Sequence, residues 1–387
     1  MIELDFGSIG LAATNWIIIA ALVVTLLVSL RRTQPVDLLP VPVSQELKGL
    51  AILAIVLAHI SYMLVTDNHF LYPLSIAAGV GVDIFLFMSG FGLTVGMLKK
   101  RMPALEFYRR RLIKVFIPLW VVLILLFAAD ALFLQHYYSP LYMLQSLLGW
   151  FPRAAAFDDV NSPFWYISWL LMFYILFPLL FMPQRPWLTA ILLAVIANVV
   201  AVTDPLDLQV DWLHRLHTNA FSLGMVVAWA LRESKGSRNP LVEKLKAFRD
   251  GGAPLVRYLL LLVLALFAGY LACHNNAGDW PVLAQALHAA RFDESFFIGQ
   301  ATSLLTMAAL IVIFSLKRME FKFLYLFGVY SFETYLLHWP LMARYDVFFH
   351  HLPAWLAPLV WLPAFIAIGW LLQKITTPLG AWFDKHI

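Results

Sequence analysis

Two ionisable residues lie in a stretch that is otherwise apolar enough to cross a membrane, "LKGLAILAIVLAHI" at positions 47–60. Lys48 and His59 are eleven positions apart. This is almost three turns of an α-helix, so they share one face and lie about 16 Å apart along its axis. An ammonium group near a membrane surface suits a phosphate, and an imidazole deeper in the helix suits proton transfer. The structural alternative is that Lys48 reaches to lipid headgroups and His59 makes one interhelical hydrogen bond.

The next apolar segment, "GVGVDIFLFMSGFGLTVG", carries a carboxylate and several small residues. Asp83 lies near its outer end, at a depth similar to that of His59 if the two helices are antiparallel, so the two groups can interact. An unpaired carboxylate in lipid would be costly. Small residues allow a second helix to approach closely, and packing alone accounts for most of them. They are Gly81, Ser89, Gly92 and Gly96.

A basic cluster follows in "KKRMPALEFYRRRLIKVFIPLW". Cytoplasmic loops of membrane proteins collect Lys and Arg, which accounts for part of the cluster. However, Arg110, Arg111 and Lys114 enter the next apolar helix, where they would present cationic groups at one end of a cavity. Arg binds phosphate through a bidentate fork and Lys binds it as a point charge. The cluster therefore also predicts a site for a cytosolic polyphosphate ligand.

A polar stripe occurs near the C-terminal end, in "YSFETYLLHWP". Ser331, Tyr335 and His338 are spaced i, i+4 and i+7, so they share one helix face. The stripe is either a hydrogen-bonded seam or the lining of a cavity, and Pro340 favours the cavity because it bends the helix. Trp165, in "NSPFWYISWLLMFYILFPLL", is either an interfacial anchor or part of that lining. Five further histidines have no ligand-like spacing and are given no role: His136, His214, His217, His350 and His351.

Composition defines the elements that position these residues. The chain of 387 residues is 62% hydrophobic and 13% charged, with a mean hydropathy of +0.80. These values predict an all-α, polytopic transmembrane helical bundle. At about 20 residues per span, eleven spans are expected, near 11–30, 44–65, 79–98, 112–134, 164–182, 186–203, 218–232, 255–273, 296–316, 323–343 and 357–373. The basic residues form short clusters between spans, which argues against nucleic-acid binding. A single cysteine, Cys273, excludes an internal disulfide and a multi-cysteine metal site.

Charge predicts the orientation of the bundle. Arg31 and Arg32 follow the first apolar run, which is the reverse of a secretory signal, so we expect a retained helix with its N-terminus outside. With eleven spans, 23 of the 27 Lys and Arg residues then fall on the inside, and the C-terminus is cytoplasmic. The polar segment 233–254 is expected to be a cytoplasmic linker.

Taken in order, these motifs resemble acyltransferase family 3, the membrane O-acyltransferases of bacterial surface carbohydrates. The similar features are the Lys48-to-His59 spacing, "GVDIFLFMSG", the basic entry at 109–118, and S-x-x-x-Y-x-x-H from Ser331 to His338. The resemblance covers about 44 to 373. It implies an extra N-terminal helix and linker at 1–43, before an acyltransferase-like domain with a ten-helix core at 44–387. Lys48 replaces a usual arginine, and "FWYISWLLMFYILFPLL" lacks the glutamate of many relatives.

The resemblance implies transfer of an acyl group, most often acetyl, from acyl-CoA to a hydroxyl of a surface carbohydrate or glycolipid precursor. It implies a protein of the bacterial inner membrane, with acyl-CoA as substrate and no permanently bound cofactor or metal. His59 is then the general base and Asp83 the residue that orients it. The donor phosphates would lie on Lys48, Arg109, Arg110, Arg111 and Lys114. The acceptor side would contain Ser89, Trp165, Ser331, Tyr335 and His338.

Two other functions fit the intramembrane polar residues. A secondary transporter or flippase would use them along a substrate pathway, and would show paired broken helices in related halves of the chain. No such symmetry is visible in the sequence. A non-catalytic sensor or scaffold would tolerate loss of these residues without a chemical phenotype.

Overall fold

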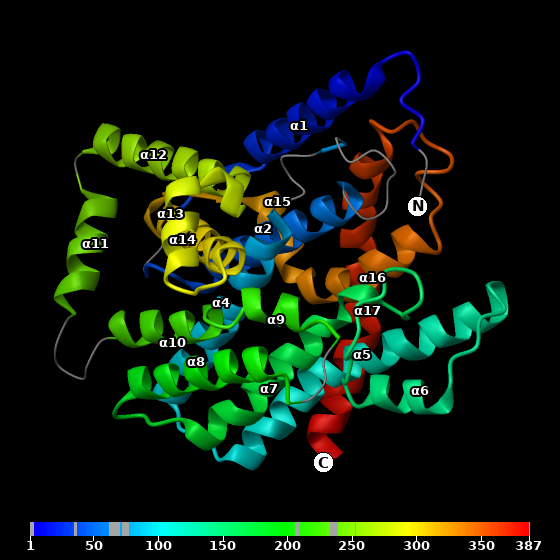
Figure 1. The fold of residues 1–387 in the computed structure, drawn as a ribbon, viewed down its shortest axis with the longest axis horizontal. Coiled ribbons are helices and arrows are strands. Elements are labelled where there is room, and N and C mark those ends of the chain that lie inside the picture. Colours follow the sequence, from blue (N-terminus) through cyan, green and yellow to red (C-terminus); the bar gives the residue numbers. More distant parts are fainter. Residues whose placement is uncertain are drawn as a thin grey trace.

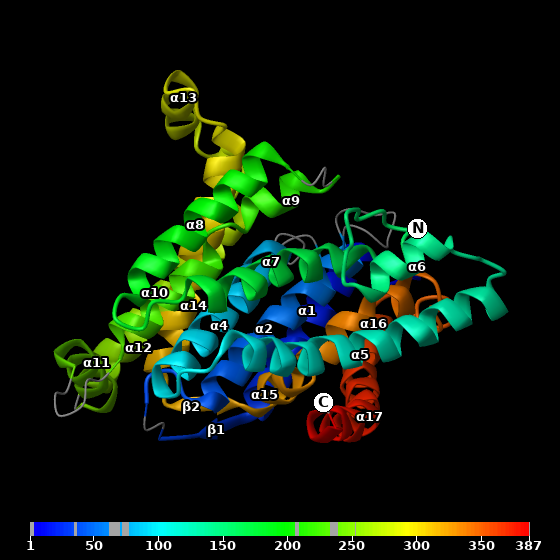
Figure 2. The same cartoon turned by 90° about the horizontal axis from the view of Figure 1, so that it is seen from below.

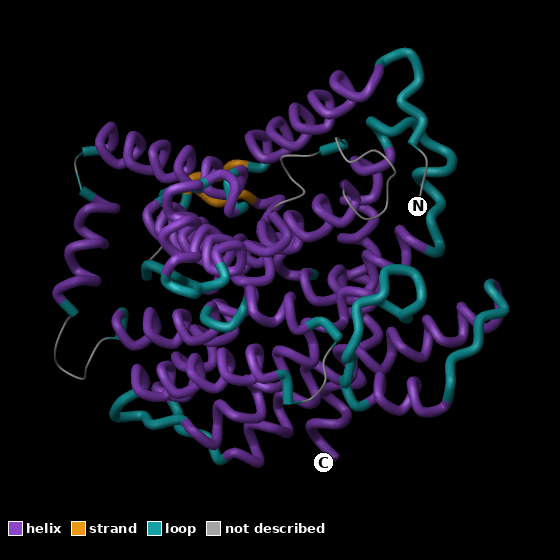
Figure 3. The backbone as a smooth tube through the Cα atoms, viewed as in Figure 1, coloured by secondary structure: helices purple, strands orange, loops and turns teal. Residues whose placement is uncertain are grey.

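The computed structural model describes residues 4–34, 37–61, 70–71, 77–205, 209–232, 239–251 and 253–386. Helices make up most of the molecule, and the only strands among these residues are two of three residues each (Figure 3). The first half contains α1 Gly10–Val28, β1 Leu30–Arg32, α2 Val41–His59, α4 Ala77–Lys99, α5 Ala104–Phe133, α6 Pro140–Leu147, η2 Ser162–Phe164, α7 Trp165–Leu180 and α8 Pro186–Thr203. The second half contains α9 Asp211–Leu216, α10 Ala220–Ala230, α11 Pro240–Asp250, α12 Pro254–Cys273, η3 Ala277–Asp279, α13 Pro281–Ala289, α14 Glu294–Leu316, β2 Met319–Phe321, α15 Lys322–Val329, α16 Ser331–Ala343 and α17 Ala357–His386.

The long helices confirm a polytopic membrane bundle. Within the described residues, nine helices are long and apolar enough to cross a membrane: α1, α2, α4, α5, α7, α8, α12, α14 and α17. The other two expected spans are shorter. Helix α10 has 11 residues, roughly 16 Å at 1.5 Å per residue, and the segment 323–343 divides at Tyr330 into α15 and α16. The expected end of the second span, beyond Ser61, lies outside the described residues.

Helix α2 lies at the centre of the bundle, packed chiefly against α15 and α4 (Figure 1). Glycines bring the backbones together: a Cβ added to Gly49 would lie 1.8 Å from the carbonyl oxygen of Leu324, and one added to Gly328 would lie 1.8 Å from that of Gln45. No larger residue fits at either position without separating the helices. The helix that carries Lys48 and His59 is therefore held on a fixed axis.

The glycines of α4 divide between packing and open positions. A Cβ on Gly81 would lie 2.6 Å from the carbonyl oxygen of Ala51, and one on Gly90 would lie 2.0 Å from that of Phe221 in α10. The expected close approach is thus confirmed at Gly81. Gly92 and Gly96 have open space around the added atom, with nothing within 4 Å, so they do not mediate a helix contact among the described residues.

A buried ion pair and a small sheet tie α2 to the junction of α14 and α15. The Lys317 ammonium lies 2.7 Å from both carboxylate oxygens of Glu46, and the backbone N–H of Phe321 donates to Glu46 Oε1 at 2.6 Å. Both charged side chains are almost fully buried. Beside this pair β1 and β2 run antiparallel, with Leu30 opposite Phe321. This connection between the end of α1 and the core was not predicted from the sequence.

Helices α1 and α12 lie at the periphery, along one edge of the bundle (Figure 1). Their large apolar side chains are exposed, as at Trp16 on α1 and Leu266 on α12. Such continuous apolar surface suits contact with lipid. The short helix α13 projects beyond the bundle, at the end where α9 also lies (Figure 2).

Candidate active site

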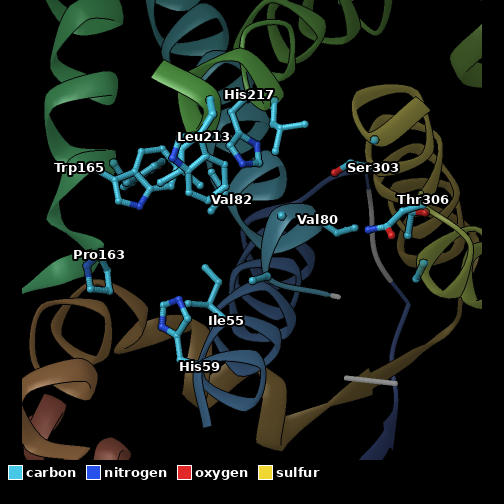
Figure 4. Close-up of a pocket in the computed structure, with 18 of the residues that line it drawn as sticks. Ile55, His59, Val80, Val82, Pro163, Trp165, Leu213, His217, Ser303 and Thr306 are labelled. Carbon is cyan, nitrogen blue, oxygen red and sulfur yellow. The ribbon is translucent and has the colours of Figure 1, made fainter. Parts of the chain in front are cut away.

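A cavity of about 580 Å³ lies where the end of α2 faces α7, α9 and α14. We call it the central cavity. Of the predicted site residues, His59, Trp165 and Tyr335 line it. Figure 4 shows His59 and Ile55 on one side of the space, with Trp165 and His217 across it and Ser303 on a third side. The structure thus brings together residues from five separate parts of the chain.

His59 is held by a second histidine. Its Nδ1 lies 2.9 Å from Nε2 of His338, and the two rings are nearly parallel, with 8° between their planes. The indole of Trp339 meets His59 edge-on, with the ring centroids 5.2 Å apart. The polar stripe of α16 and the intramembrane histidine of α2 therefore form one unit.

The other nitrogen of His338 sets the direction of this hydrogen bond. His338 Nδ1 lies 2.9 Å from the carbonyl oxygen of Tyr335 and 3.1 Å from that of Thr334. Carbonyl oxygens only accept, so Nδ1 of His338 carries a proton, and in the neutral ring Nε2 holds the lone pair. His59 must then donate from Nδ1. This assignment puts the basic lone pair of His59 on Nε2.

Asp83 is fully buried and faces a different histidine from the one expected. The Nδ1 of His217 donates to Asp83 Oδ1 at 2.8 Å, and the hydroxyl of Ser303 donates to Oδ2 at 2.5 Å. Both carboxylate oxygens are therefore engaged, and the predicted pairing of Asp83 with His59 is replaced by two separate pairs. The reason is the position of His217, which follows α9 and packs over the start of α4, 3.7 Å from a Cβ built on Gly79.

His217 is the site residue that sequence reasoning missed. Its ring lines the central cavity and lies against Trp165, with 5.8 Å between centroids and 23° between planes. Its carbonyl oxygen accepts from the indole N–H of Trp169 at 3.2 Å. His214, given no role as well, stacks on Trp169. The only signal in the sequence was the i, i+3 spacing of the two histidines beside an apolar segment.

Three of the five predicted phosphate-binding residues lie together at the opposite end of α2. They are Lys48, Arg111 and Lys114, and we call this region the basic end. Lys48 lies within electrostatic range of both other residues. The Arg111 guanidinium lies over the ring of Phe107, 5.8 Å from its centroid, and its Nε is buried with no hydrogen-bond partner among the described residues. An unsatisfied cationic donor of this kind suits an anionic ligand.

Two other residues of the predicted set have acidic partners instead. Arg109 forms an ion pair with Asp384 of α17 at 3.2 Å, and Arg110 forms one with Glu106 at 2.6 Å. Both pairs are partly exposed. Exposed pairs of this kind are weak, so either arginine can still reach a stronger anionic partner.

A row of side chains joins the basic end to the central cavity. Tyr166 lines the cavity and lies close to the hydroxyl of Ser89. Tyr174 lies 3.5 Å from the same hydroxyl, and its ring meets Phe107 edge-on, beside Arg111. Lysine and arginine are absent from the described lining of the cavity. The row therefore lies between the two regions, and Ser89 belongs to it and does not line the cavity on the acceptor side.

A family model described as an acyltransferase domain matches residues 47–373, well over half of the chain. The chain belongs to acyltransferase family 3. No curated protein and no solved structure shows a significant match. The matched region begins one residue before Lys48 and contains both histidine pairs and the basic end.

An acyltransferase needs binding sites for an acyl donor and an acceptor. The His59–His338 pair suits proton transfer, and the basic end suits an anionic portion of a donor. Ser331, expected on the acceptor side, is buried at the start of α16 and does not line the cavity. Within the described residues, no cluster of three or more His, Cys, Asp or Glu side chains forms a metal site.

Proposed function

We propose that the protein transfers an acyl group, most often acetyl, from acyl-CoA to a hydroxyl of a cell-surface carbohydrate or glycolipid precursor. The observation that carries this proposal is the hydrogen bond from His59 Nδ1 to His338 on the wall of the central cavity. It holds the ring in one tautomer, with the lone pair on Nε2. In a member of acyltransferase family 3, a histidine held in this way suits the role of general base.

The reaction begins when His59 Nε2 takes the proton of the acceptor hydroxyl. The oxygen attacks the thioester carbonyl, the carbon–sulfur bond breaks, and the thiolate of coenzyme A leaves. The proton then passes from His59 to that thiolate, so the products are the acyl ester and the free thiol. His338 supports the step because it accepts a hydrogen bond from His59 Nδ1, which steadies the charged ring.

The donor phosphates would bind at the basic end, on Lys48, Arg111 and Lys114, with Arg109 and Arg110 as further contacts. The buried Nε of Arg111 supports this, because a phosphate oxygen would satisfy it. The pantetheine arm must then cover about 16 Å from Lys48 to His59, so the row of Tyr174, Ser89 and Tyr166 has to open when acyl-CoA binds.

The acceptor would bind in the central cavity, against the wall formed by Trp165, Tyr335 and His217. Aromatic faces pack against the apolar faces of sugars, and the histidine offers a polar contact to a hydroxyl. Asp83 acts here as a positioning residue for His217. In the bacterial inner membrane the basic end would face the cytoplasm, where acyl-CoA is found, and the N-terminus would lie outside.

The test is transfer by purified protein supplied with radiolabelled acetyl-CoA and bacterial surface polysaccharide. We expect wild-type protein to release free thiol and label the polysaccharide in equal amounts. His59→Ala should lower transfer by about a hundredfold or more while the protein remains folded. Full transfer by this variant would remove His59 from the mechanism, and thiol release without labelled polysaccharide would show hydrolysis in place of transfer.

A further inference from the structure

A second cavity, of about 410 Å³, adjoins the central cavity. We call it the polar cavity. Its lining comes from α6, the connection that follows α6, and Gln209 in the segment that precedes α9. It plays no part in the reaction proposed above.

Two segments of the chain form walls of both cavities. In the first, Arg153 and Asn161 line the polar cavity, whereas their neighbours Ala154 and Ser162 line the central one. In the second, Gln209 lines the polar cavity, whereas Trp212, Leu213, Leu216 and His217 line the central one. The backbone N–H of Gln209 donates to the carbonyl oxygen of Pro152 at 3.0 Å, which joins the two segments. The two cavities therefore adjoin along these two segments.

The polar cavity has a fixed hydrogen-bonding frame. Asp159 is almost fully buried and accepts from the Arg153 guanidinium and from the backbone N–H of Ala155, both at 2.8 Å. The hydroxyl of Tyr142 accepts from the backbone N–H of Val160 at 3.0 Å. Burial, with a smaller contribution from the Asp159 charge, raises the pKa of Tyr142, so the phenol stays protonated. The groups that face a ligand are therefore held in place before it binds.

Asn161 is the residue that points to a ligand. It is 2% exposed, and its Nδ2 donates to the carbonyl oxygen of Leu336 at 2.8 Å. Its Oδ1 is buried and has no hydrogen-bond partner among the described residues. A buried amide oxygen without a donor is unfavourable, so a hydroxyl or N–H from a ligand would stabilise it.

The lining favours an uncharged, hydroxyl-rich ligand. Arg153 is neutralised by Asp159 at 2.8 Å, so the cavity has no spare cation to attract a phosphate. Trp150 and Tyr142 supply aromatic surface, and the amides of Gln145 and Asn161 supply donors and acceptors. Aromatic surface beside fixed polar groups suits a sugar ring, which has apolar faces and polar edges.

We infer that the polar cavity is a second saccharide subsite, which binds a sugar unit next to the one acylated in the central cavity. This inference rests on the proposed carbohydrate acceptor. Asn161 links the subsite to the central cavity through the hydrogen bond that it donates to Leu336. The residue before Leu336 is Tyr335, which lines the central cavity and donates from its hydroxyl to the carbonyl oxygen of Pro163 at 2.5 Å. Binding in the polar cavity would therefore select acceptors of at least two sugar units and orient them at His59.

The first test is binding, with purified full-length protein on an array of bacterial surface oligosaccharides. We expect wild-type protein to bind a class of uncharged glycans of two or more units, and inorganic phosphate not to compete. Trp150→Leu and Gln145→Ala should each weaken this binding about tenfold. The matched controls Tyr137→Leu and Gln135→Ala replace exposed residues of the connection between α5 and α6, outside the cavity lining, and should bind as wild type. Absence of glycan binding by wild-type protein would overturn the inference.

The second test separates the subsite from the reaction. His59→Ala should keep the part of glycan binding that the polar cavity provides, because His59 does not line the polar cavity. If glycan binding is lost in His59→Ala but kept in Trp150→Leu, glycans bind only in the central cavity and the inference is wrong, while the proposed function stands. A different result would separate the two proposals the other way. If wild-type protein transfers no acyl group to any acceptor, and Trp150→Leu loses glycan binding whereas His59→Ala keeps it, the proposed function fails and the subsite stands.

In a transfer assay, Trp150→Leu should raise the KM for a disaccharide acceptor about tenfold and leave the KM for a monosaccharide glycoside unchanged. An equal rise for both acceptors would contradict a subsite for the second sugar unit, because it would place Trp150 at the acylated unit. Gln145→Ala supplies an independent variant if Trp150→Leu does not fold.

Discussion

The central cavity has two histidines with different partners on its two sides. His59 pairs with another imidazole, and the chain of hydrogen bonds ends at backbone carbonyls. His217 pairs with the carboxylate of Asp83, which is also bound by Ser303. The first arrangement is uncharged when both rings are neutral, whereas the second contains a buried carboxylate. The same residue type is thus given two environments within one cavity.

These partners indicate which histidine suits proton transfer and which suits acceptor binding. A base must hold a proton only briefly, and His338 can support the charged form of His59 without adding a permanent charge to the site. A histidine fixed by a buried carboxylate is held in one tautomer and one orientation, which suits binding and positioning of an acceptor. If this comparison is right, damage to the first pair lowers the rate of transfer, and damage to the second weakens acceptor binding.

Among changes to the partners of the two histidines, the largest effect is expected for His338→Ala. Loss of the acceptor for His59 Nδ1 frees the ring and removes support for its charged form, so kcat should fall about ten- to a hundredfold. His338→Gln should recover part of this loss, because an amide oxygen can accept from His59. The measurement is kcat of wild type and both variants across a range of pH, because release of the His59 ring should also change the dependence of kcat on pH. The control is His351→Ala, an exposed histidine outside the cavity. A His338→Ala enzyme with wild-type kcat would show that the pair is only structural.

A smaller effect of a different kind is expected for Asp83→Asn. The amide can still accept from His217 through one atom, but it loses the charge and presents a donor toward Ser303. The KM for the acceptor should therefore rise about tenfold, with kcat and the KM for acetyl-CoA little changed. Asp158→Asn, an exposed position, is the control. A fall in kcat alone would mean that Asp83 serves the base after all, and the contrast between the two pairs would disappear.

The local parts of the site could be predicted from the sequence. The helical period placed Lys48 and His59 on one face of one helix, and the spacing of Ser331, Tyr335 and His338 gave the stripe of α16. The hydropathy of the chain predicted the transmembrane helical bundle. Each of these depends on residues a few turns apart, where helix geometry is fixed.

The partners across the bundle could not be predicted from the sequence. His338 lies 279 positions from His59, and His217 lies 134 positions from Asp83. Depth in the membrane suggested the pair Asp83 and His59, but the actual partner of Asp83, His217, comes from the connection between α9 and α10, outside the predicted spans. Helix packing determines which histidine pairs with Asp83. Helix α10 approaches α4 closely at Gly90, so the turn before α10, which carries His217, lies over Asp83.

Removal of the second hydrogen bond to Asp83 should have a moderate effect. Ser303→Ala leaves His217 in place and deletes one donor to the carboxylate, so the KM for the acceptor should rise about three- to fivefold. The variant with both Ser303→Ala and Asp83→Asn should be no worse than Asp83→Asn alone, because the two changes remove the same interaction. Additive losses in the double variant would indicate that Ser303 contacts the acceptor directly.

The smallest effect is expected at the basic end, with Lys48→Ala. A partly exposed ammonium that meets a phosphate contributes modestly, so the KM for acetyl-CoA should rise about two- to fourfold, and less at high salt. S-acetyl-N-acetylcysteamine has the thioester end of the donor but no phosphates, so its KM should be the same in wild-type and variant enzymes. Lys244→Ala, on α11, controls for the loss of a positive charge elsewhere. Equal losses with both donors would contradict a phosphate contact at Lys48 and leave the two histidine pairs untouched, because neither pair contacts the phosphate end of the donor.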